Sequence, residues 1–250
     1  MLPLGLPSSV STIRGIDDAV NQRRVVSIKT ATKRYVKRQT SRGVRESARS
    51  LFLELRYWRL HCREARKAGQ FLQTQPIRLQ LGCGPNPKKG WINIDRFNRS
   101  ADLQLDLRED WPFPSNSASY IYSEHVFEHF EFLVEVPHLL REAHRVLRPG
   151  GVFDVVVPDT QTVLQAYGDP DALYWLETKR WHPDWCQTKL DHINYHFRQN
   201  GEHKYAWDAE TLARTLEAAG FTSILERDFD PKLDTEERRF ASLYMSAKKP

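Results

Sequence analysis

A short apolar run that ends in Gly-x-Gly constrains this chain more than any other feature. Residues 79–86 read Leu-Gln-Leu-Gly-Cys-Gly-Pro-Asn, and Asp95 follows nine residues after Asn86. Two glycines directly after a strand let the backbone turn sharply and approach a ligand closely, because no Cβ stands in the way. A carboxylate soon afterwards can accept hydrogen bonds from the two hydroxyls of a ribose. Together these features predict a nucleoside-containing ligand.

The dinucleotide fingerprint Gly-x-Gly-x-x-Gly is absent, because Pro87 occupies the position of its third glycine. NAD and FAD carry a pyrophosphate that needs a helix N-terminus at close range, so we expect neither of them. A ligand without phosphate makes no such demand. The simpler alternative for a Gly-x-Gly on its own is a tight turn without a ligand.

The size and composition are those of a globular chain. It has 250 residues, of which 40% are hydrophobic and 28% charged, enough for one sizeable α/β domain with an appendage. No apolar run approaches the roughly 20 residues that cross a bilayer, and residues 1–10 lack the basic region of a secretory signal. Cys62, Cys83 and Cys186 lie far apart, which suggests neither a disulfide framework nor a zinc site. We therefore expect a reducing, cytoplasmic location.

Positive charge is concentrated towards the N-terminus. Residues 1–70 hold 16 Lys and Arg against 5 Asp and Glu, whereas the remainder holds 21 against 27. Residues 1–40 are basic and poorly periodic, so we expect a flexible or loosely docked arm; a transit peptide has a similar composition. Because the rest of the chain is acidic and the arm has a single aromatic residue, Tyr35, we do not expect nucleic-acid binding. An RNA-associated enzyme that uses the arm is an alternative.

Residues 41–72 are expected to contain an amphipathic N-terminal helix. Between residues 44 and 65, apolar positions recur in alternating steps of four and three, with arginines on the other faces. The stripe consists of Val44, Ala48, Leu51, Leu55, Trp58, Cys62 and Ala65. Such a helix can pack on its own domain. Alternatively it covers the active site, binds a partner protein, or lies on an anionic membrane, which would make the protein peripheral to that membrane.

Residues 73–250 are expected to form one α/β domain, since strand and helix patterns alternate. The expected strands are 77–82, 91–95, 101–106, 119–123, 151–157, 222–229 and 240–247. One long helix is expected over about 127–148, ended by Arg-Pro-Gly-Gly, and another over about 208–219. The last two strands have no helix between them, which predicts a closing antiparallel hairpin.

Four segments in order carry a resemblance to a known family. They are Leu-Gly-Cys-Gly (81–84), Gly-Trp-Ile-Asn-Ile-Asp (90–95), Tyr-Ser-Glu-His-Val-Phe-Glu-His (122–129), and Val-Leu-Arg-Pro-Gly-Gly with the strand and Val-Pro-Asp that follow (146–159). The chain resembles the class I S-adenosylmethionine-dependent methyltransferases, specifically a bacterial branch with Glu-His-x-x-Glu-His after the fourth strand. The resemblance covers about residues 77–247. It implies a Rossmann-like, mostly parallel sheet of seven strands in the order 3-2-1-4-5-7-6, with the last strand antiparallel.

One departure from the family concerns its first helix. Ten residues separate Gly84 from Asp95, whereas a parallel crossover usually needs a dozen or more. We therefore expect the first helix to be stunted or missing.

The resemblance implies S-adenosylmethionine as the cofactor and S-adenosylhomocysteine as the product. Gly82, Cys83 and Gly84 would lie under the methionine part, and Asp95 would bind the ribose. Asp106 and Leu107 would lie near the adenine, and Ser123 beside the sulfonium.

The catalytic residues implied at the same edge of the sheet are Glu124 and His125, with His203 from later in the chain. A neutral histidine can take a proton from an attacking hydroxyl, so we expect O-methylation of a small-molecule or carbohydrate acceptor with His125 or His203 as the base. No Asn/Asp-Pro-Pro-Tyr sequence follows the fourth strand, which argues against methylation of nucleic-acid bases. His125 to His129 also spell His-x-x-Glu-His, an inverted zinc-protease motif, but no metal is expected because the sheet already explains this segment.

The segment 174–207 is rich in Trp, Tyr and His and is expected to determine the substrate. Aromatic faces suit sugar rings. The residues expected to contact the acceptor are Trp181, His192, Tyr195, His196 and Tyr205. An aromatic mini-core under a long loop is the alternative, and His203 with Asp191 and His192 could instead hold a divalent cation. A further alternative for the whole chain is a non-catalytic member of a membrane-associated glycan assembly.

Overall fold

The computed structural model describes residues 39–73, 76–169 and 172–250, so the arm expected over residues 1–40 lies almost wholly outside them. The chain divides into two compact units, Met1–Arg56 and Tyr57–Pro250.

The expected N-terminal helix is present as α2, Arg42–Ala65, followed by the short 3₁₀ helix η1, Ala68–Phe71. It begins after Ser41, whose hydroxyl accepts a hydrogen bond from the Val44 N–H (3.2 Å) and so satisfies one of the free donors of the first turn. From Tyr57 onward α2 belongs to the larger unit. There the Tyr57 ring meets the edge of Phe97, and Arg96 lies over the same ring. None of the helices in the described parts of the chain is long and apolar enough to span a membrane.

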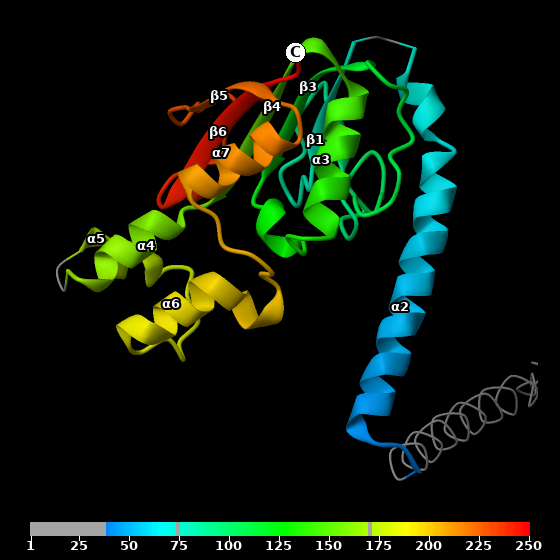
Figure 1. Ribbon diagram of the computed structural model, residues 1–250. Coiled ribbons are helices and arrows are strands. Elements are labelled where there is room, and N and C mark those ends of the chain that lie inside the picture. Colours follow the sequence, from blue (N-terminus) through cyan, green and yellow to red (C-terminus); the bar gives the residue numbers. More distant parts are fainter. Residues whose placement is uncertain (1–38, 74–75, 170–171) are drawn as a thin grey trace, which may run out of the picture. The chain divides into compact units, whose positions relative to one another are not determined.

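The larger unit is built on a mixed sheet, whose six strands within the described residues run in the order β2-β1-β3-β4-β6-β5 (Figure 1). The strands are β1 Ile77–Leu81, β2 Ile92–Ile94, β3 Ala118–Glu124, β4 Leu147–Pro158, β5 Thr222–Glu226 and β6 Ser242–Lys248. β1 to β4 run parallel to one another, and β6 is antiparallel to both β4 and β5. The expected Rossmann-like α/β class and the closing antiparallel hairpin are therefore confirmed.

The expected sheet has seven strands, one more than the sheet of the described residues. The strand expected over residues 101–106 makes only a single bridge, between Leu103 and Ile94. The neighbouring β2 offers only three residues for pairing, and the Asp102 carboxylate takes the backbone N–H of Asn93 (2.8 Å). Without this edge strand, the remaining strands keep the expected order.

The crossover between β1 and β2 contains no helix, as the short spacing predicts. Side chains hold it instead. Gln80 donates to the Asn86 carbonyl (3.1 Å), and the Lys88 N–H donates to the side-chain oxygens of Gln80 (2.9 Å) and Asn93 (2.7 Å). These bonds satisfy a loop that would otherwise leave buried polar backbone groups unpaired.

The long helix is shorter than expected. Residues 127–129 form a separate 3₁₀ turn, η2 Phe127–His129, and α3 spans Glu135–Val146. The extended backbone of Phe130 (φ −108°, ψ 143°) separates them. The turn Arg148-Pro149-Gly150 is absorbed into β4. The remaining helices are α4 Thr160–Tyr167, α5 Leu173–Thr178, α6 Lys189–Arg198 and α7 Ala209–Ala218, with 3₁₀ turns η3 Gln199–Gly201 and η4 Glu236–Arg238.

The core follows the two-residue period of the strands. Ile121 and Val155 point into the main hydrophobic cluster, which includes Leu139 of α3 and Leu216 of α7. Side chains of the opposite face, such as Tyr122, pack in a smaller cluster with residues 229–233. In Figure 1, α3 and α7 lie over one face of the sheet, and α4, α5 and α6 gather beyond its β4–β6 end.

Candidate functional site

The glycine turn after β1 has a backbone that only glycine adopts easily. Gly82 (φ +61°) and Gly84 (φ +51°) are both in the left-handed region. A Cβ on Gly82 would lie 2.3 Å from Cγ2 of Val126, so this position packs tightly on the segment after β3. A Cβ on Gly84 would meet no atom within 4 Å. The turn is therefore closed at Gly82 and open at Gly84.

Asp95 holds this turn in place. Its Oδ2 accepts the Gly84 N–H (2.9 Å), and its Oδ1 accepts the N–H groups of Phe97 (2.7 Å) and Asn98 (2.8 Å). The Asn98 amide in turn donates to the Gly84 carbonyl. A carboxylate offers about four acceptor positions, so these bonds leave about one, on Oδ2, for a ligand hydroxyl.

Cys83 lies between the two glycines and is buried. Burial, with the negative charges of Asp95 and Asp102, raises the pKa of its thiol to about 12. The thiol is neutral at physiological pH and contributes shape rather than chemistry.

Asp106 and Leu107 are both buried. The Asp106 carboxylate pairs with Arg108 (2.7 Å) and Arg96 (3.2 Å), and its backbone N–H donates to Nδ1 of His61 in α2 (3.2 Å). Burial opposes ionisation, but the two arginines outweigh it and lower the pKa of Asp106. Sequence reasoning missed the contact with His61, because that residue lies 45 positions from Asp106.

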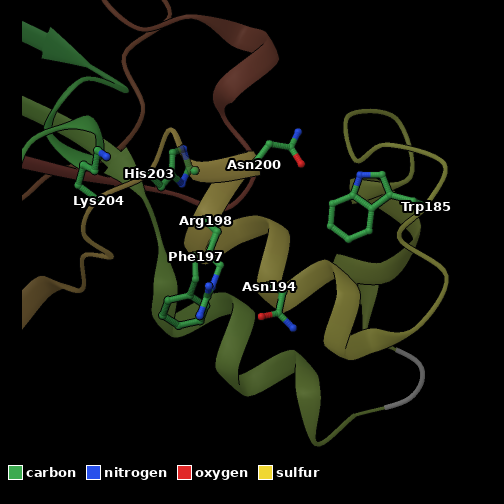
Figure 2. A pocket seen from close by; sticks show the side chains of 8 residues that line it. Trp185, Asn194, Phe197, Arg198, Asn200, His203 and Lys204 are labelled. Atoms are coloured by element: carbon green, nitrogen blue, oxygen red, sulfur yellow. The ribbon is translucent and has the colours of Figure 1, made fainter. Parts of the chain in front are cut away.

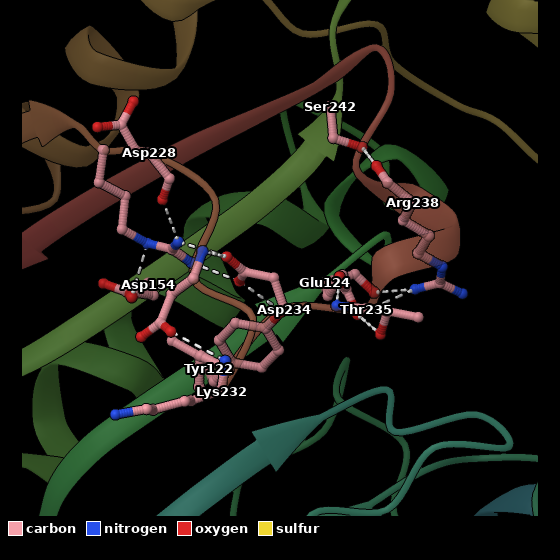
Figure 3. Close-up of polar contacts among 12 residues, drawn as sticks. Tyr122, Glu124, Asp154, Asp228, Lys232, Asp234, Thr235, Arg238 and Ser242 are labelled. Atoms are coloured by element: carbon pink, nitrogen blue, oxygen red, sulfur yellow. Dashed lines mark hydrogen bonds and ion pairs between the residues drawn. The ribbon is translucent and has the colours of Figure 1, made fainter. Parts of the chain in front are cut away.

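The end of β3 carries Ser123 and Glu124, and both side chains are buried. Ser123 is fully buried, and its hydroxyl finds no hydrogen-bond partner within the described residues. The Glu124 carboxylate accepts the N–H (3.0 Å) and hydroxyl (2.6 Å) of Thr235, while the Glu124 carbonyl accepts from Arg238 (2.9 Å; Figure 3). These bonds brace the 235–238 segment against β3 and do not support the catalytic position expected of Glu124.

A second polar network visible in Figure 3 lies on the same face of the sheet. Arg227 pairs with Asp154 (3.0 Å) and Asp234 (2.6 Å), and the Tyr122 hydroxyl donates to Asp234 (3.0 Å). No sequence pattern predicts this network, because its members are separated by up to 112 positions.

His125 follows β3 with a left-handed backbone (φ +54°), and its N–H donates to the Val156 carbonyl (2.8 Å). Its Nε2 lies 2.9 Å from the Ser242 hydroxyl. That hydroxyl already donates to the Arg238 carbonyl (2.5 Å), so Nε2 must be the donor and Nδ1 keeps its lone pair. Burial, with the charge of Arg238, holds the pKa of His125 well below its usual value.

Glu128 lies beside this lone pair and is almost completely buried. Its Oε1 is 3.9 Å from both Nδ1 of His125 and Nε2 of His129. Its Oε2 has no hydrogen-bond partner among the described residues. Burial raises the pKa of Glu128 to about 8, so the carboxyl retains a proton at neutral pH.

His129 and His203 complete the cluster, with their rings edge to face at 5.1 Å. Nδ1 of His129 lies 3.2 Å from the Glu202 carbonyl, and Nδ1 of His203 lies 2.7 Å from the His196 carbonyl. A carbonyl only accepts, so both Nδ1 atoms carry the proton and both Nε2 atoms keep lone pairs. Burial lowers the pKa of each histidine. The ligand atoms of Glu128, His129 and His203 lie within 4.8 Å of one another, so their geometry would allow them to share a cation.

His203 also lines a cavity of about 710 Å³ (Figure 2). The other residues of its wall are Trp185, Asn194, Phe197, Arg198, Asn200, Gly201 and Lys204. All of them come from residues 174–207, the segment expected to determine the substrate. Of the site residues predicted from the sequence, His203 is the one that lines this cavity. Trp185, Asn194 and Asn200 were not among the predicted site residues.

The residues expected to contact the acceptor are otherwise spread over several environments. Tyr205 stacks on Phe132 (4.2 Å) and lines a separate cavity of about 750 Å³ between α3 and α7. Nε2 of His196 lies 3.3 Å from the Thr160 hydroxyl. Tyr205 also meets the ring of Trp207 at 4.9 Å, so this residue packs among aromatic rings.

The other three residues expected to contact the acceptor, Trp181, His192 and Tyr195, come from α6 and from the connection between α5 and α6. Trp181 is partly exposed beside Phe240, and Tyr195 meets the ring of His182 at 4.8 Å. His192 also faces His182. The Asp191 carboxylate caps α6 by accepting the N–H groups of Gln187 and Thr188, so it does not join His192 and His203 in a cation site.

The comparisons with known proteins agree with this architecture. The family model for the methyltransferase domain matches residues 62–226, about two thirds of the chain. The chain belongs to this methyltransferase family. The match confirms the enzyme class expected from the four sequence segments, an S-adenosylmethionine-dependent methyltransferase. No curated protein matches it in sequence.

Solved structures similar to this methyltransferase include three bacterial S-adenosylmethionine-dependent methyltransferases. One from Thermotoga maritima, described as a possible histamine N-methyltransferase, is 16% identical; the match covers 81% of this chain and 97% of that chain, with a TM-score of 0.44. One from Listeria monocytogenes is 19% identical over 76% and 99% of the two chains (TM-score 0.40). One from Mesorhizobium loti is 20% identical over 69% and 90% (TM-score 0.42).

Proposed function

We propose that this methyltransferase transfers a methyl group from S-adenosylmethionine to a hydroxyl group of a small-molecule or carbohydrate acceptor, with His203 as the general base. The observation that carries the proposal is the position of His203, a neutral imidazole in the wall of a cavity of about 710 Å³.

The glycine turn fits the cofactor. Gly84 has open space where a side chain would stand, and Asp95 retains about one acceptor position on Oδ2. Gly82, Cys83 and Gly84 would lie under the methionine part of the cofactor, and Asp95 would accept a ribose hydroxyl. When bound, S-adenosylmethionine supplies an electrophilic methyl group.

One short segment connects the glycine turn to the cavity. Val126 packs against Gly82, and three residues later the ring of His129 meets that of His203. The Glu128 carbonyl accepts the backbone N–H of Lys204 (2.7 Å), which ties the cavity wall to the same segment. Residues 125–129 therefore set how the acceptor side is held relative to the cofactor side, and alignment is the main contribution a protein makes to an in-line displacement.

His203 is prepared to accept a proton from a hydroxyl. Its Nδ1–H is fixed on the His196 carbonyl, so Nε2 presents the lone pair. Removal of the hydroxyl proton during attack is worth roughly 10²- to 10⁴-fold in rate. Trp185 and Phe197 offer flat apolar faces, and Asn194 and Asn200 offer hydrogen bonds, a combination suited to a sugar ring or a similar hydroxylated acceptor.

The test is methyl transfer from isotopically labelled S-adenosylmethionine to a panel of hydroxyl, amine and carboxylate acceptors. We expect label in hydroxyl acceptors, with a loss of roughly 10²- to 10⁴-fold in kcat for His203→Gln and unchanged binding of S-adenosylhomocysteine. His138→Gln on α3 is the matched control and should keep full activity. Exclusive methylation of amines, or full activity of His203→Gln, would overturn the proposal.

A second role concerns attachment to a surface. Leu51, Phe52 and Leu55 of α2 are exposed, and arginines lie among them. We propose that this part of α2 binds an anionic membrane peripherally. Sedimentation with phosphatidylglycerol vesicles should carry the full chain down at low salt, and Phe52→Glu should abolish this; equal sedimentation of the variant would contradict it.

A further inference from the structure

Three side chains of types that can bind metals, two histidines and a cysteine, meet in the part of the chain that runs from α5 to α6. His182 and Cys186 come from the connection between the two helices, and His192 comes from the first turn of α6. Nδ1 of His182 lies 2.6 Å from Nδ1 of His192, and their rings stack at 4.8 Å. The ligand atoms of all three residues, including Sγ of Cys186, lie within 4.8 Å of one another.

Local structure places these side chains. Thr188 and Asp191 form a capping box at the start of α6, which fixes the orientation of its first turn and hence of His192. A turn closed by the hydrogen bond from the Cys186 N–H to the Pro183 carbonyl (2.9 Å) brings Cys186 back towards the helix. The Asp191 carboxylate is used in the cap, so the donor set is two imidazoles and one thiol.

This donor set fits zinc. Imidazole nitrogen and cysteine sulfur are the usual ligands of zinc in proteins, and sulfur disfavours magnesium and calcium. Two nitrogens on one tetrahedral zinc lie roughly 3.3 Å apart, so a small rotation of the two rings would open the 2.6 Å gap enough. On binding, Cys186 would lose its proton to solvent and bind as the thiolate. Water would take the fourth position, as it does in sites with three protein ligands.

The surrounding structure would gain from such an ion. α6 buries none of its residues fully, so apolar packing alone holds it weakly to the domain. Small elements with little core are often held by a metal or a disulfide. Asn194, Phe197 and Arg198 of α6 and Trp185, next to Cys186, line the cavity that contains His203. An ion at this position would therefore fix one wall of that cavity.

We propose that His182, Cys186 and His192 bind one zinc ion that joins α6 to the connection after α5.

The proposal is tested on the full-length protein after removal of metals with a chelator. Zinc added in competition with a chromophoric chelator should bind at about one ion per chain. Cobalt(II) in place of zinc should give the near-ultraviolet charge-transfer absorption of a cobalt–thiolate bond. This absorption separates the site from the cluster of Glu128, His129 and His203, which contains no sulfur.

Cys186→Ser should remove the cobalt–thiolate absorption and weaken zinc binding roughly 100-fold or more, since even the loss of a residue that supports a ligand costs about 10- to 100-fold. Cys62→Ser is the matched control, because Cys62 is also a partly buried free thiol, and it should change neither reading. His192→Gln, with folding checked by circular dichroism, should weaken zinc binding as Cys186→Ser does. Absence of zinc binding, or zinc binding and cobalt absorption that survive Cys186→Ser, would overturn the proposal. None of these measurements requires methyl transfer, so they stand apart from the proposed function.

Discussion

The carboxylate of Asp95 accepts a hydrogen bond from the backbone N–H of Gly84 at 2.9 Å. The glycine turn and the acidic residue are thus one unit, although β2 lies between them in the chain. A residue expected to bind only the ligand also shapes the surface on which the ligand would lie.

Because Asp95 both shapes the turn and would bind the ligand, we expect Asp95→Asn to weaken ligand binding strongly. An asparagine amide would place N–H donors against either the Gly84 N–H or those of Phe97 and Asn98. We expect the affinity for S-adenosylhomocysteine, measured by calorimetry, to fall roughly 10- to 100-fold, equivalent to the about 1.5–3 kcal/mol of a hydrogen bond to a charged group. Asp110→Asn, on a fully exposed side chain, is the control. Equal affinities for the two variants would contradict this assignment.

The two glycines of the turn should respond differently to alanine. Gly82→Ala combines a left-handed backbone (about 1–2 kcal/mol) with overlap against Val126 (about 1–3 kcal/mol), so we expect a loss of roughly 2–5 kcal/mol in the free energy of unfolding. Gly84→Ala meets no neighbour and should lose only about 1–2 kcal/mol.

Ligand binding should separate the two variants further. Because its Cβ would enter the open space at the turn, Gly84→Ala should bind S-adenosylhomocysteine far more weakly than its small loss of stability suggests. Urea unfolding and calorimetry of both variants, with Gly69→Ala as a near-neutral control, check the pair of expectations. If Gly84→Ala bound the product normally, the turn would not lie under the ligand.

The sequence patterns correctly predicted those parts of the fold that depend on residues close together in the chain. The Gly-x-Gly turn, the stunted crossover and the closing hairpin follow from glycine chemistry, spacing and the absence of an intervening helix. The prediction of an edge strand over residues 101–106 was wrong. Pairing there depends on the length of β2 and on the hydrogen bond of Asp102, and the strand pattern reveals neither of them.

Side-chain partners at the site could not be predicted for a similar reason. Glu124 ends its strand as expected, but the residues that occupy its carboxylate, Thr235 and Arg238, lie more than 100 positions away. Likewise, the facing pair His182 and His192 depends on how α6 is capped and turned. One sequence shows which residue types are present, whereas the tertiary structure decides which of them meet.

The buried Glu128 predicts an unusual dependence of stability on pH. Its folded-state pKa, about 8, lies above the ordinary value of 4.5. Between these values Glu128 binds more protons in the folded state than in the unfolded state, so its contribution to stability falls as the pH rises, by at most about 1.4 kcal/mol per pH unit. Glu128→Gln cannot ionise and should flatten the curve obtained from urea unfolding between pH 5 and pH 8. Glu131→Gln, on an exposed carboxylate nearby, should leave it unchanged. A curve for Glu128→Gln as steep as that of the parent protein would show that Glu128 does not carry the proton.

The pH dependence of catalysis should report His203. Burial lowers its pKa below 6.5, and the nearby His129 acts in the same direction, while the hydrogen bond to the His196 carbonyl opposes them. A base acts in its neutral form, so the decrease of kcat/KM towards low pH should be centred below pH 6.5. In His203→Gln the remaining rate should be low and should lose the acid limb centred below pH 6.5, whereas His138→Gln should retain that limb. An acid limb centred above pH 6.5, or one that persists in His203→Gln, would assign the base to another residue, and His125, whose Nδ1 also keeps its lone pair, would be the next to test.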